Sequence, residues 1–441
     1  MTFVRPPSVR GSRLCLAALS ALALACGTDG RDNTGSGIGL DPTIGSGGVD
    51  GDASTGTSTG AADEGGGDEA SPATDTANAD GSSGGDAMLP KFDIGYNPGG
   101  EVDCMANPAM DEDGDGWTGN QGDCNDCDAD VNPGAIEVVV TMPDDTGQIP
   151  APADENCDGL VDNLMPSCDG ALALDDDDPL SAAAALGICK VSSGPGDWGI
   201  VDAKYVRANG AAVAGADLQY GLQTEWGTNV DPQEGASMLV LSSGHARYAG
   251  QAGECGALTC YGSGAGTAPA GFPQDVPACA GSTNINDDIA LELTLRAPTN
   301  ATGYAYNFDF YSFEYPEWVC TSFNDQYIAL VDPAPMGSIN GNISFDSMSN
   351  PVSVNIAFFD VCSGCALGTS ELAGTGFDTW DDAGATSWLV TTAPVGGGDE
   401  FTIRFAIWDT GDSAWDSTVL LDNFRWLAGG GEVDVGTEPE G

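Results

Sequence analysis

The chain has 441 residues, of which 67 are acidic and 12 are basic, giving a formal net charge of −55. This excess of negative charge excludes proteins that bind nucleic acid or an anionic membrane face through a basic patch. The sequence also has no glycine-rich phosphate loop with a lysine, so nucleotide binding has no support. The length allows two or three domains.

The N-terminal segment predicts export. Three arginines within the first 13 residues precede an apolar run, 14–25, which is too short to span a bilayer and is followed by Cys26. We therefore expect a signal peptide at 1–25 and lipid attachment to Cys26, which would anchor the protein at the outer membrane or cell surface; ordinary cleavage and secretion is the alternative. Residues 26–90, rich in Gly, Ser, Thr, Asp and Ala, predict a disordered tether.

Residues 101–166 form an acidic module that contains two runs of alternating oxygen ligands. A hard cation is wrapped by a loop with carboxylates at positions 1, 3 and 5, a turn glycine at 6 and a backbone carbonyl at 7. Position 12 of the first run is Gly122 instead of the Glu of an EF-hand, so Asp123 or Asp126 is expected to close its shell. The predicted ligand set is Asp111, Asp113, Asp115, the Trp117 carbonyl, Asp123, Asp126, Asp128, Asp130, Asp154, Asn156, Asp158, the Leu160 carbonyl and Asp162.

These carboxylates have no basic neighbour in the sequence. Between Lys91 and Lys190 there is neither lysine nor arginine. Crowded acids of one sign must protonate, stay apart in water or bind metal. Oxygen-only ligands favour Ca²⁺ over Zn²⁺ or Cu²⁺, so Ca²⁺ is the predicted cofactor. The alternative is that the acids are merely solvated.

The fourteen cysteines indicate disulfides, because twelve remain after the signal peptide and the lipid-bearing Cys26 are removed. The short spacings suggest the pairs Cys168–Cys189, Cys255–Cys260 and Cys362–Cys365. A zinc site at the last pair has little support, because it lacks a second CxxC pair and because the sole histidine, His245, is far away in the sequence.

The rest of the chain predicts a mainly β fold. Residues 167–189 form a connector whose acid-headed segment, 180–186, predicts a short helix. Residues 190–427 alternate short β-favouring runs with turn residues, which indicates an antiparallel, jelly-roll-like β-sandwich. The clearest strands are expected at 238–241, 289–295, 304–313, 327–331, 402–408 and 418–426. One strand is expected in the module, at 136–140, and the tail 428–441 is expected to be disordered.

Two stretches resemble known families. Residues 111–163 resemble the MopE-type metal-binding motif of bacterial surface proteins, through Asp111–Trp117, Asp123–Asp126, Asn132–Glu137 and Asp154–Gly159 with Asp162. This resemblance implies a small, disulfide-tied, cation-binding extracellular module. Residues 190–427 resemble a choice-of-anchor L domain, through Leu241–His245, Phe308–Trp318, Phe323–Asp325, Phe358–Cys362, Ile407–Asp412 and Leu421–Phe424. That resemblance implies an exported protein fixed to the envelope, with no established activity.

The C-terminal domain also offers polar and aromatic groups whose role is open. Six acids could form a sugar-binding or hydrolytic cleft or a further Ca²⁺ site: Glu314, Glu317, Asp409, Asp412, Asp416 and Asp422. Trp318, Trp408 and Trp415 could stack on sugar rings, although such residues more often belong to a core. His245 has no G-x-S-x-G elbow beside it and is interpreted as a turn residue.

The sequence therefore predicts a lipid-anchored surface protein that uses a Ca²⁺-bound module to display a β-sandwich for binding or adhesion. The expected partners are the membrane, through the N-terminal lipid, and a glycan or a surface protein. The chain is not expected to be an enzyme. The alternatives are a polysaccharide-active hydrolase on a jelly-roll scaffold and a ligand-free envelope scaffold.

Overall fold

The computed structural model describes residues 107–141, 147–260, 262–356, 358–380, 382–429 and 431–440. The chain divides into two compact units, Met1–Gly85 and Asp86–Gly441, and only the second contains described residues. The predicted signal peptide, the lipid site at Cys26 and the tether 26–90 lie outside the described residues. Among the described residues, no helix has the length and apolar character needed to cross a bilayer.

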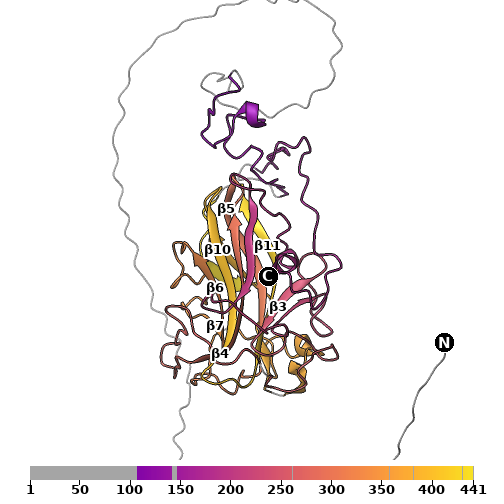
Figure 1. Ribbon diagram of the computed structural model, residues 1–441, viewed down its shortest axis with the longest axis vertical. Coiled ribbons are helices and arrows are strands. Elements are labelled where there is room, and N and C mark those ends of the chain that lie inside the picture. The colour runs from indigo at the N-terminus through magenta and orange to yellow at the C-terminus, as the bar shows by residue number, and fades with distance from the viewer. Residues whose placement is uncertain are drawn as a thin grey trace, which may run out of the picture. The chain divides into compact units, whose positions relative to one another are not determined.

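The second unit is built around two antiparallel sheets, as the predicted mainly β class required. The first has the order β1-β4-β10-β6-β7 and the second β12-β9-β5-β11-β3-β2, with β8 pairing against β5. Figure 1 labels strands β4, β10, β6 and β7 of the first sheet and β5, β11 and β3 of the second. The bounds are β1 Gly199–Val206, β2 Tyr220–Gln223, β3 Met238–Ser242, β4 Ile285–Arg296, β5 Ala301–Ser312, β6 Gln326–Asp332, β7 Val352–Ser353, β8 Gly384–Ala385, β9 Leu389–Pro394, β10 Glu400–Thr410, β11 Ser417–Ala428 and β12 Gly436–Pro439.

Among the described residues, helices are few and short. The helix α1, Pro179–Ala185, begins where the acid-headed segment predicted it, because the Asp178 side chain accepts a hydrogen bond from the Leu180 N–H at 3.0 Å and Pro179 suits the first helical position. Three 3₁₀ turns complete the inventory of described helices: η1 Gly119–Gln121, η2 Ser370–Leu372 and η3 Phe377–Thr379.

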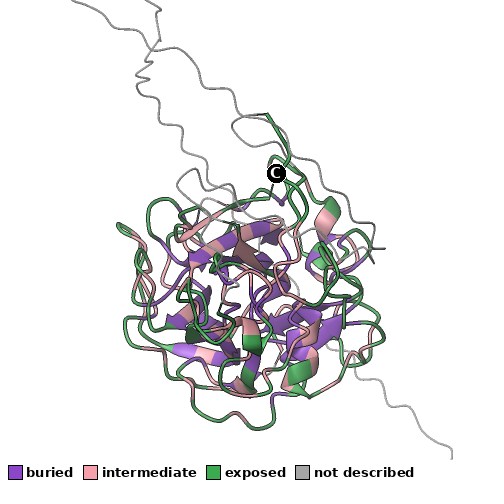
Figure 2. Cartoon of the chain, turned by 90° about the horizontal axis from the view of Figure 1, so that it is seen from above, coloured by how far each residue is buried: buried purple, intermediate pink, exposed green. Residues whose placement is uncertain are grey.

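Successive long strands alternate between the two sheets, and each contributes one face to the layer between them. In β5, Tyr306, Phe308 and Phe310 belong to the central cluster, whereas Tyr311 belongs to a separate cluster on the outer face. The same alternation of period two holds in β10, where Phe405 is central. Buried residues therefore follow the strands, and the exposed ones gather in the loops (Figure 2).

Two sequence predictions are wrong. Residues 136–140 form no strand. The backbone of Ile136 hydrogen-bonds to a side chain and not to a neighbouring strand: the Asn300 amide oxygen accepts from the Ile136 N–H at 3.0 Å, and the Asn300 NH₂ group donates to the Ile136 carbonyl at 2.8 Å. The described part of the tail is not disordered throughout, because β12 pairs with the edge strand β9. The contacts of Asn300 also fix the acidic module to the turn between β4 and β5.

Candidate metal centre

The first acidic loop folds back on its own carboxylates. Asp111 accepts hydrogen bonds from the N–H groups of Gly114 at 2.6 Å and Gly116 at 3.1 Å. Asp115 accepts from the Trp117 N–H at 2.7 Å. Gly114 and Gly116 have φ values of 87° and 93°, a left-handed conformation that side chains other than glycine rarely adopt. The glycines therefore let the loop curl around its own acidic side chains.

This curvature brings carboxylate oxygens from distant parts of the module together. Oxygens of Asp111, Asp113 and Asp115 all lie within 4.8 Å of one another, and so do oxygens of Asp113, Asp123 and Asp126. Asp113 belongs to both groups. Asp123 is 3% exposed and Asp126 is fully buried, so the acids that follow η1 form the interior of the site. The five side chains thus form one cluster around Asp113.

Several of these oxygens have no hydrogen-bond partner within the described structure. They are one oxygen each of Asp113, Asp115, Asp123 and Asp126. A buried carboxylate oxygen without a partner is costly, because it has lost its water and gained nothing in return. A cation bound in this cluster would supply the missing partner for such oxygens.

Burial and mutual repulsion also disturb the protonation of the cluster. Burial, followed by repulsion from neighbouring aspartates, raises the pKa of the Asp123 carboxyl to about 6, although the Asn125 N–H partly stabilises its charge. The pKa values of Asp113 and Asp115 are raised too, with burial as the main cause. These shifts have the direction expected where like charges meet without a cation.

The structure does not bring every predicted ligand into this cluster. Asp128 and Asp130 are exposed and lie outside both groups. The second loop repeats the first in its hydrogen bonding: Asp154 accepts from the N–H groups of Asp158 and Gly159 at 3.1 and 2.9 Å. Its carboxylates do not form a three-acid group among the described residues. One oxygen of Asp162 has no partner there.

The other predicted ligands of the second loop take part in hydrogen bonds within the loop. Asn156 Oδ1 also accepts from the Asp158 N–H, at 2.9 Å. The N–H of Leu160 donates to Asp158 at 2.8 Å, and Leu160 itself is 60% exposed. Side-chain hydrogen bonds of this kind shape a loop without metal, so the second loop is the weaker of the two candidate sites.

Sequence reasoning assigned no ligand role to two residues that support the module. Asn132 is fully buried and accepts hydrogen bonds from the Gly134 N–H at 2.9 Å and the Thr299 hydroxyl at 2.6 Å. Glu137 is 8% exposed and accepts from the Asn156 N–H at 3.2 Å, so it links the segment after the first loop to the second loop. Both lie within the stretch Asn132–Glu137, which the sequence marked only as part of a wider resemblance.

Disulfides tie these parts together. Cys124–Cys157 joins the first loop to the second, so the Cys124-x-x-Cys127 pair is not bridged to itself. The three pairs expected from short spacing are present: Cys168–Cys189, Cys255–Cys260 and Cys362–Cys365. A further disulfide, Cys279–Cys320, was not expected. In the disulfide form the Cys362–Cys365 pair offers no thiolates for zinc.

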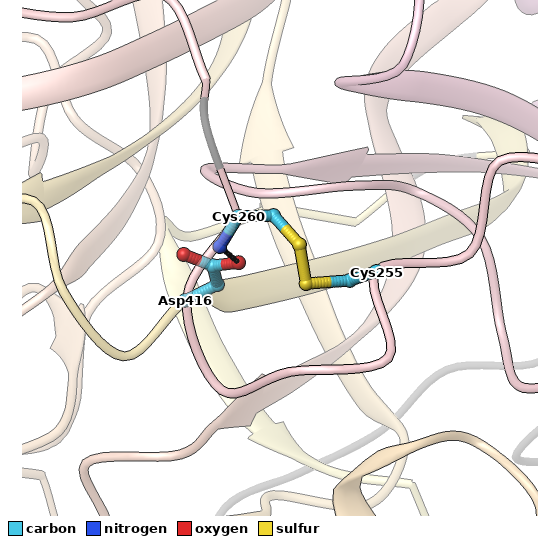
Figure 3. A group of neighbouring side chains, drawn as sticks. All are labelled: Cys255, Cys260 and Asp416. Atoms are coloured by element: carbon cyan, nitrogen blue, oxygen red, sulfur yellow. Dashed lines mark hydrogen bonds between the residues drawn. A yellow bond between two sulfur atoms is a disulfide. The ribbon is translucent and has the colours of Figure 1, made fainter. Parts of the chain in front are cut away.

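Another close group in the sandwich contains a disulfide and an acid. Cys255, Cys260 and Asp416 lie within 4.8 Å of one another, but the two sulfurs are bonded together and cannot act as thiolate ligands (Figure 3). The Cys260 N–H instead donates to one oxygen of Asp416 at 2.7 Å. The bridged loop therefore holds this carboxylate in place.

Comparison with known proteins establishes the affiliation of the sandwich. Residues 201–424, about half of the chain, match the family model of the choice-of-anchor L domain. The chain belongs to this family. It is accordingly a surface-associated or exported protein with a β-domain. No curated protein matches the chain.

One solved structure shares a weak likeness with the chain. The K2 cleaved adhesin domain of Lys-gingipain aligns at 13% identity over 54% of this chain and 94% of that chain. The TM-score is 0.23, which is too low to support an argument about shared architecture or function.

Within the choice-of-anchor domain, the acids predicted to line a cleft divide by exposure. Glu314, Asp409 and Asp416 are at most 4% exposed, whereas Glu317 and Asp412 are exposed. Asp422 is fully buried and accepts hydrogen bonds from the N–H groups of Gln233, Glu234 and Asn423. A hydrolytic pair must reach a substrate, and the buried acids do not face solvent.

The tryptophans divide in the same way. Trp408 is fully buried, as a core residue would be. Trp318 and Trp415 are partly exposed and make an edge-on contact, with ring centroids 5.5 Å apart. Trp380, which sequence reasoning did not single out, contacts Trp415 at 5.8 Å and is 38% exposed. These three rings are called the tryptophan cluster below. His245 donates a hydrogen bond to the Gly253 carbonyl at 2.8 Å, as a turn residue would.

Proposed function

We propose that the protein is a lipid-anchored surface protein whose acidic module binds Ca²⁺ and whose choice-of-anchor domain binds a partner outside the cell. Family membership supports the surface location. The lipid anchor rests on the sequence around Cys26, which lies outside the described residues. The expected Ca²⁺ rests on the acidic module.

The observation that carries the cation proposal is the convergence around Asp113. Five carboxylates from one loop and the turn after it meet there, and four of their oxygens have no partner among the described residues. All the donors are oxygens, which suits Ca²⁺, Mg²⁺ or Mn²⁺ rather than Zn²⁺ or Cu²⁺. A flexible loop with many carboxylates fits Ca²⁺ best, because Mg²⁺ demands near-ideal octahedral geometry and keeps several waters.

Calorimetric titration of the purified full-length protein with Ca²⁺ tests this proposal. We expect a dissociation constant of roughly 10⁻⁴–10⁻³ M for the module, as in other extracellular sites. Asp113→Asn should weaken this binding about tenfold or more, because Asp113 belongs to both oxygen groups. Asp128→Asn, in the same module but exposed, is the matched control and should bind as the wild type does. Equal binding by the Asp113 variant would refute the assignment.

The tryptophan cluster favours a glycan as the partner. Partly exposed aromatic rings gathered at one place offer faces on which sugar rings pack. Trp380 is the most accessible of them, because it is exposed whereas Trp318 and Trp415 are only partly exposed. Its neighbours Trp318 and Trp415 come from the segments after β5 and before β11, so the cluster spans three separate parts of the chain.

A glycan array with the full-length protein tests this partner. We expect binding to at least one glycan class without turnover, reduced about tenfold or more by Trp380→Ala. Trp198→Ala is the matched control, because Trp198 is also partly exposed but lies beside Lys190, away from the cluster. Release of sugar products would instead favour the hydrolase alternative, and equal binding by both variants would remove the cluster from the site.

A further inference from the structure

The layer between the two sheets changes from apolar to acidic at one end. Along each central strand, the side chains that face the other sheet lie two residues apart and belong to one hydrophobic cluster. Beyond the last apolar residue of each strand, the next one or two positions at this two-residue spacing hold polar residues. The series are Leu239 and Leu241 of β3 followed by Ser243; Phe308, Phe310 and Ser312 of β5 followed by Glu314; Tyr327 of β6 preceded by Asp325; Phe405, Ile407 and Asp409 of β10; and Val419 and Ser417 of β11.

The strand pairing confirms that these positions meet. Ser417 pairs with Ser312 across β11 and β5, and Trp408 pairs with Gln326 across β10 and β6. The Ser417 hydroxyl donates to Asp325 at 2.7 Å, which joins the second sheet to the first. The Thr410 N–H donates to the other oxygen of Asp325 at 2.9 Å. Both oxygens of this carboxylate are therefore held in fixed positions.

Four acids at this end are almost completely buried. Asp325 is fully buried, Asp409 is 1% exposed, Glu314 is 3% exposed and Asp416 is 4% exposed. None of them forms a salt bridge with a described lysine, arginine or histidine. Burying several carboxylates together without a cation is strongly unfavourable.

Among the four acids, Asp409 gives the strongest evidence that a ligand is missing. It faces the other sheet, and neither of its oxygens has a hydrogen-bond partner among the described residues. The nearby Ser243 hydroxyl donates to the Ser417 carbonyl at 3.3 Å instead. One oxygen of Asp416 and one of Glu314 are unpartnered as well. Four carboxylate oxygens at this end of the layer thus have no hydrogen-bond partner among the described residues.

The electrostatic environment supports the same conclusion. Burial, and then repulsion from Asp325, raises the pKa of Glu314 to about 10. Burial likewise raises the pKa of Asp416 to about 8, with Asp325 among the repelling charges. The pKa of Asp409 is raised by burial and then by Asp325 and Asp416. Asp325, Asp409 and Asp416 therefore all repel one another.

We propose that a hard divalent cation of the Ca²⁺ type binds between the two sheets, held by the carboxylates of Asp325, Asp409 and Asp416, with Glu314 as a further ligand. This site is distinct from the acidic module in residues, position and burial. The oxygens of these acids are not all within 4.8 Å of one another, unlike those of the first loop. Without a cation these like charges repel and stay apart, and Asp409, whose two oxygens have no partner among the described residues, is the side chain that would turn towards the ion.

The surrounding loops are built to hold this geometry. Asp416 is fixed from outside by the N–H of Cys260 in the disulfide-bridged loop (Figure 3). Gly244 lies so close to the Asp416 carboxylate that a Cβ at that position would collide with it. Trp415 of the tryptophan cluster directly precedes Asp416. A cation at this site would thereby also order one wall of the proposed binding surface.

Native mass spectrometry and thermal unfolding of the full-length protein, with Ca²⁺ and with chelator, test the proposal. We expect Asp409→Asn to bind one Ca²⁺ fewer per chain than the wild type. The wild type should gain about 5–10 °C in Tm at a Ca²⁺ concentration about 100 times the dissociation constant. The variant should lose that gain, yet in chelator it should be at least as stable as the wild type, because an unpartnered buried charge is gone.

Two controls keep this result separate from the proposed module site. Asp113→Asn should keep the interlayer ion, and the exposed Asp231→Asn should keep both sites. Wild-type stoichiometry and Ca²⁺-dependent Tm in Asp409→Asn would overturn the proposal, whatever the module binds. If that variant does not fold, crystals of the wild type soaked in Tb³⁺ decide: an anomalous peak between Asp325, Asp409 and Asp416 supports the site, and its absence overturns it.

Discussion

Chelation of divalent cations should expose the acidic module to proteolysis. A glutamate-specific serine protease, which needs no metal, would cut after Glu137 and Glu155. At a Ca²⁺ concentration about 100 times the dissociation constant, we expect a chelator to speed these cuts about 100-fold, because that is the stabilisation that mass action supplies. Mass spectrometry of the fragments with time measures the rate at each site.

The size of this effect follows from what the module lacks. Among its described residues, 107–141 and 147–166, Ala135 is the single buried apolar side chain. Apart from Gly134, the other buried residues there are polar: Asp123, Asp126, Asn132 and Glu137. A segment with so small an apolar core needs disulfides or metal to stay folded. Cys124–Cys157 supplies one such constraint, and the cation would supply the other.

Variants separate the module from the rest of the protein. Asp115→Asn should give the fast cuts at Glu137 and Glu155 even in Ca²⁺, and Asp128→Asn should not. Cleavage after Glu400, an exposed residue at the start of β10, reports on the sandwich and should not change in Asp115→Asn. Cutting rates at Glu137 that do not depend on chelator would show that the acids are merely solvated.

The sandwich could be predicted from sequence because its strands are long and strongly patterned. In β4 and β10, alternate large apolar residues such as Leu291 and Phe405 must share a face, and turn residues bound each run. The short strands β7 and β8, of two residues each, carry no such pattern. Strand β12 was missed because Gly- and Glu-rich sequence disfavours a strand, and only the exposed edge of β9 makes it one.

The two candidate sites differ in how far they could be predicted from the sequence, for a related reason. The grouping of acids in the first loop was predictable because these acids are local in sequence, with Asp111, Asp113 and Asp115 spaced as one turn requires. The interlayer acids come from strands far apart in the chain, Asp325 from before β6 and Asp409 from β10. The sequence marked Asp409 and Asp416 as acids of interest, but the sequence alone does not show which strands lie next to each other. It therefore gave no sign that Asp325 lies beside them or that they are buried.

The second large effect expected concerns pH and Asp309. This residue of β5 is fully buried on the outer face of its sheet; one oxygen accepts from the Thr386 hydroxyl at 3.1 Å, and the other has no partner among the described residues. Burial, with repulsion from Glu371 in η2, raises the pKa of Asp309 from 3.8 to about 7. The adjacent Tyr311 is the other titratable group that faces it.

A raised pKa means that the folded state holds its proton more tightly than the unfolded state does. The stability contributed by the neutral acid is therefore fully present below about pH 4 and is lost as the pH rises through about 7. Between pH 5 and pH 8 we expect Asp309 to lower the free energy of unfolding by about 3 kcal/mol. Urea unfolding in chelator at several pH values measures this change.

Asp309→Asn isolates the contribution, because asparagine resembles the protonated acid and does not titrate. The difference in unfolding free energy between variant and wild type should be small at pH 4 and grow in favour of the variant up to pH 8. Asp231→Asn, at an exposed position, should show no such trend. A difference in unfolding free energy that stays constant from pH 4 to pH 8 would contradict this prediction. It would mean that Asp309 is ionised in the folded protein across this range. Its buried charge would then have to be balanced by a group that the structure does not place beside it.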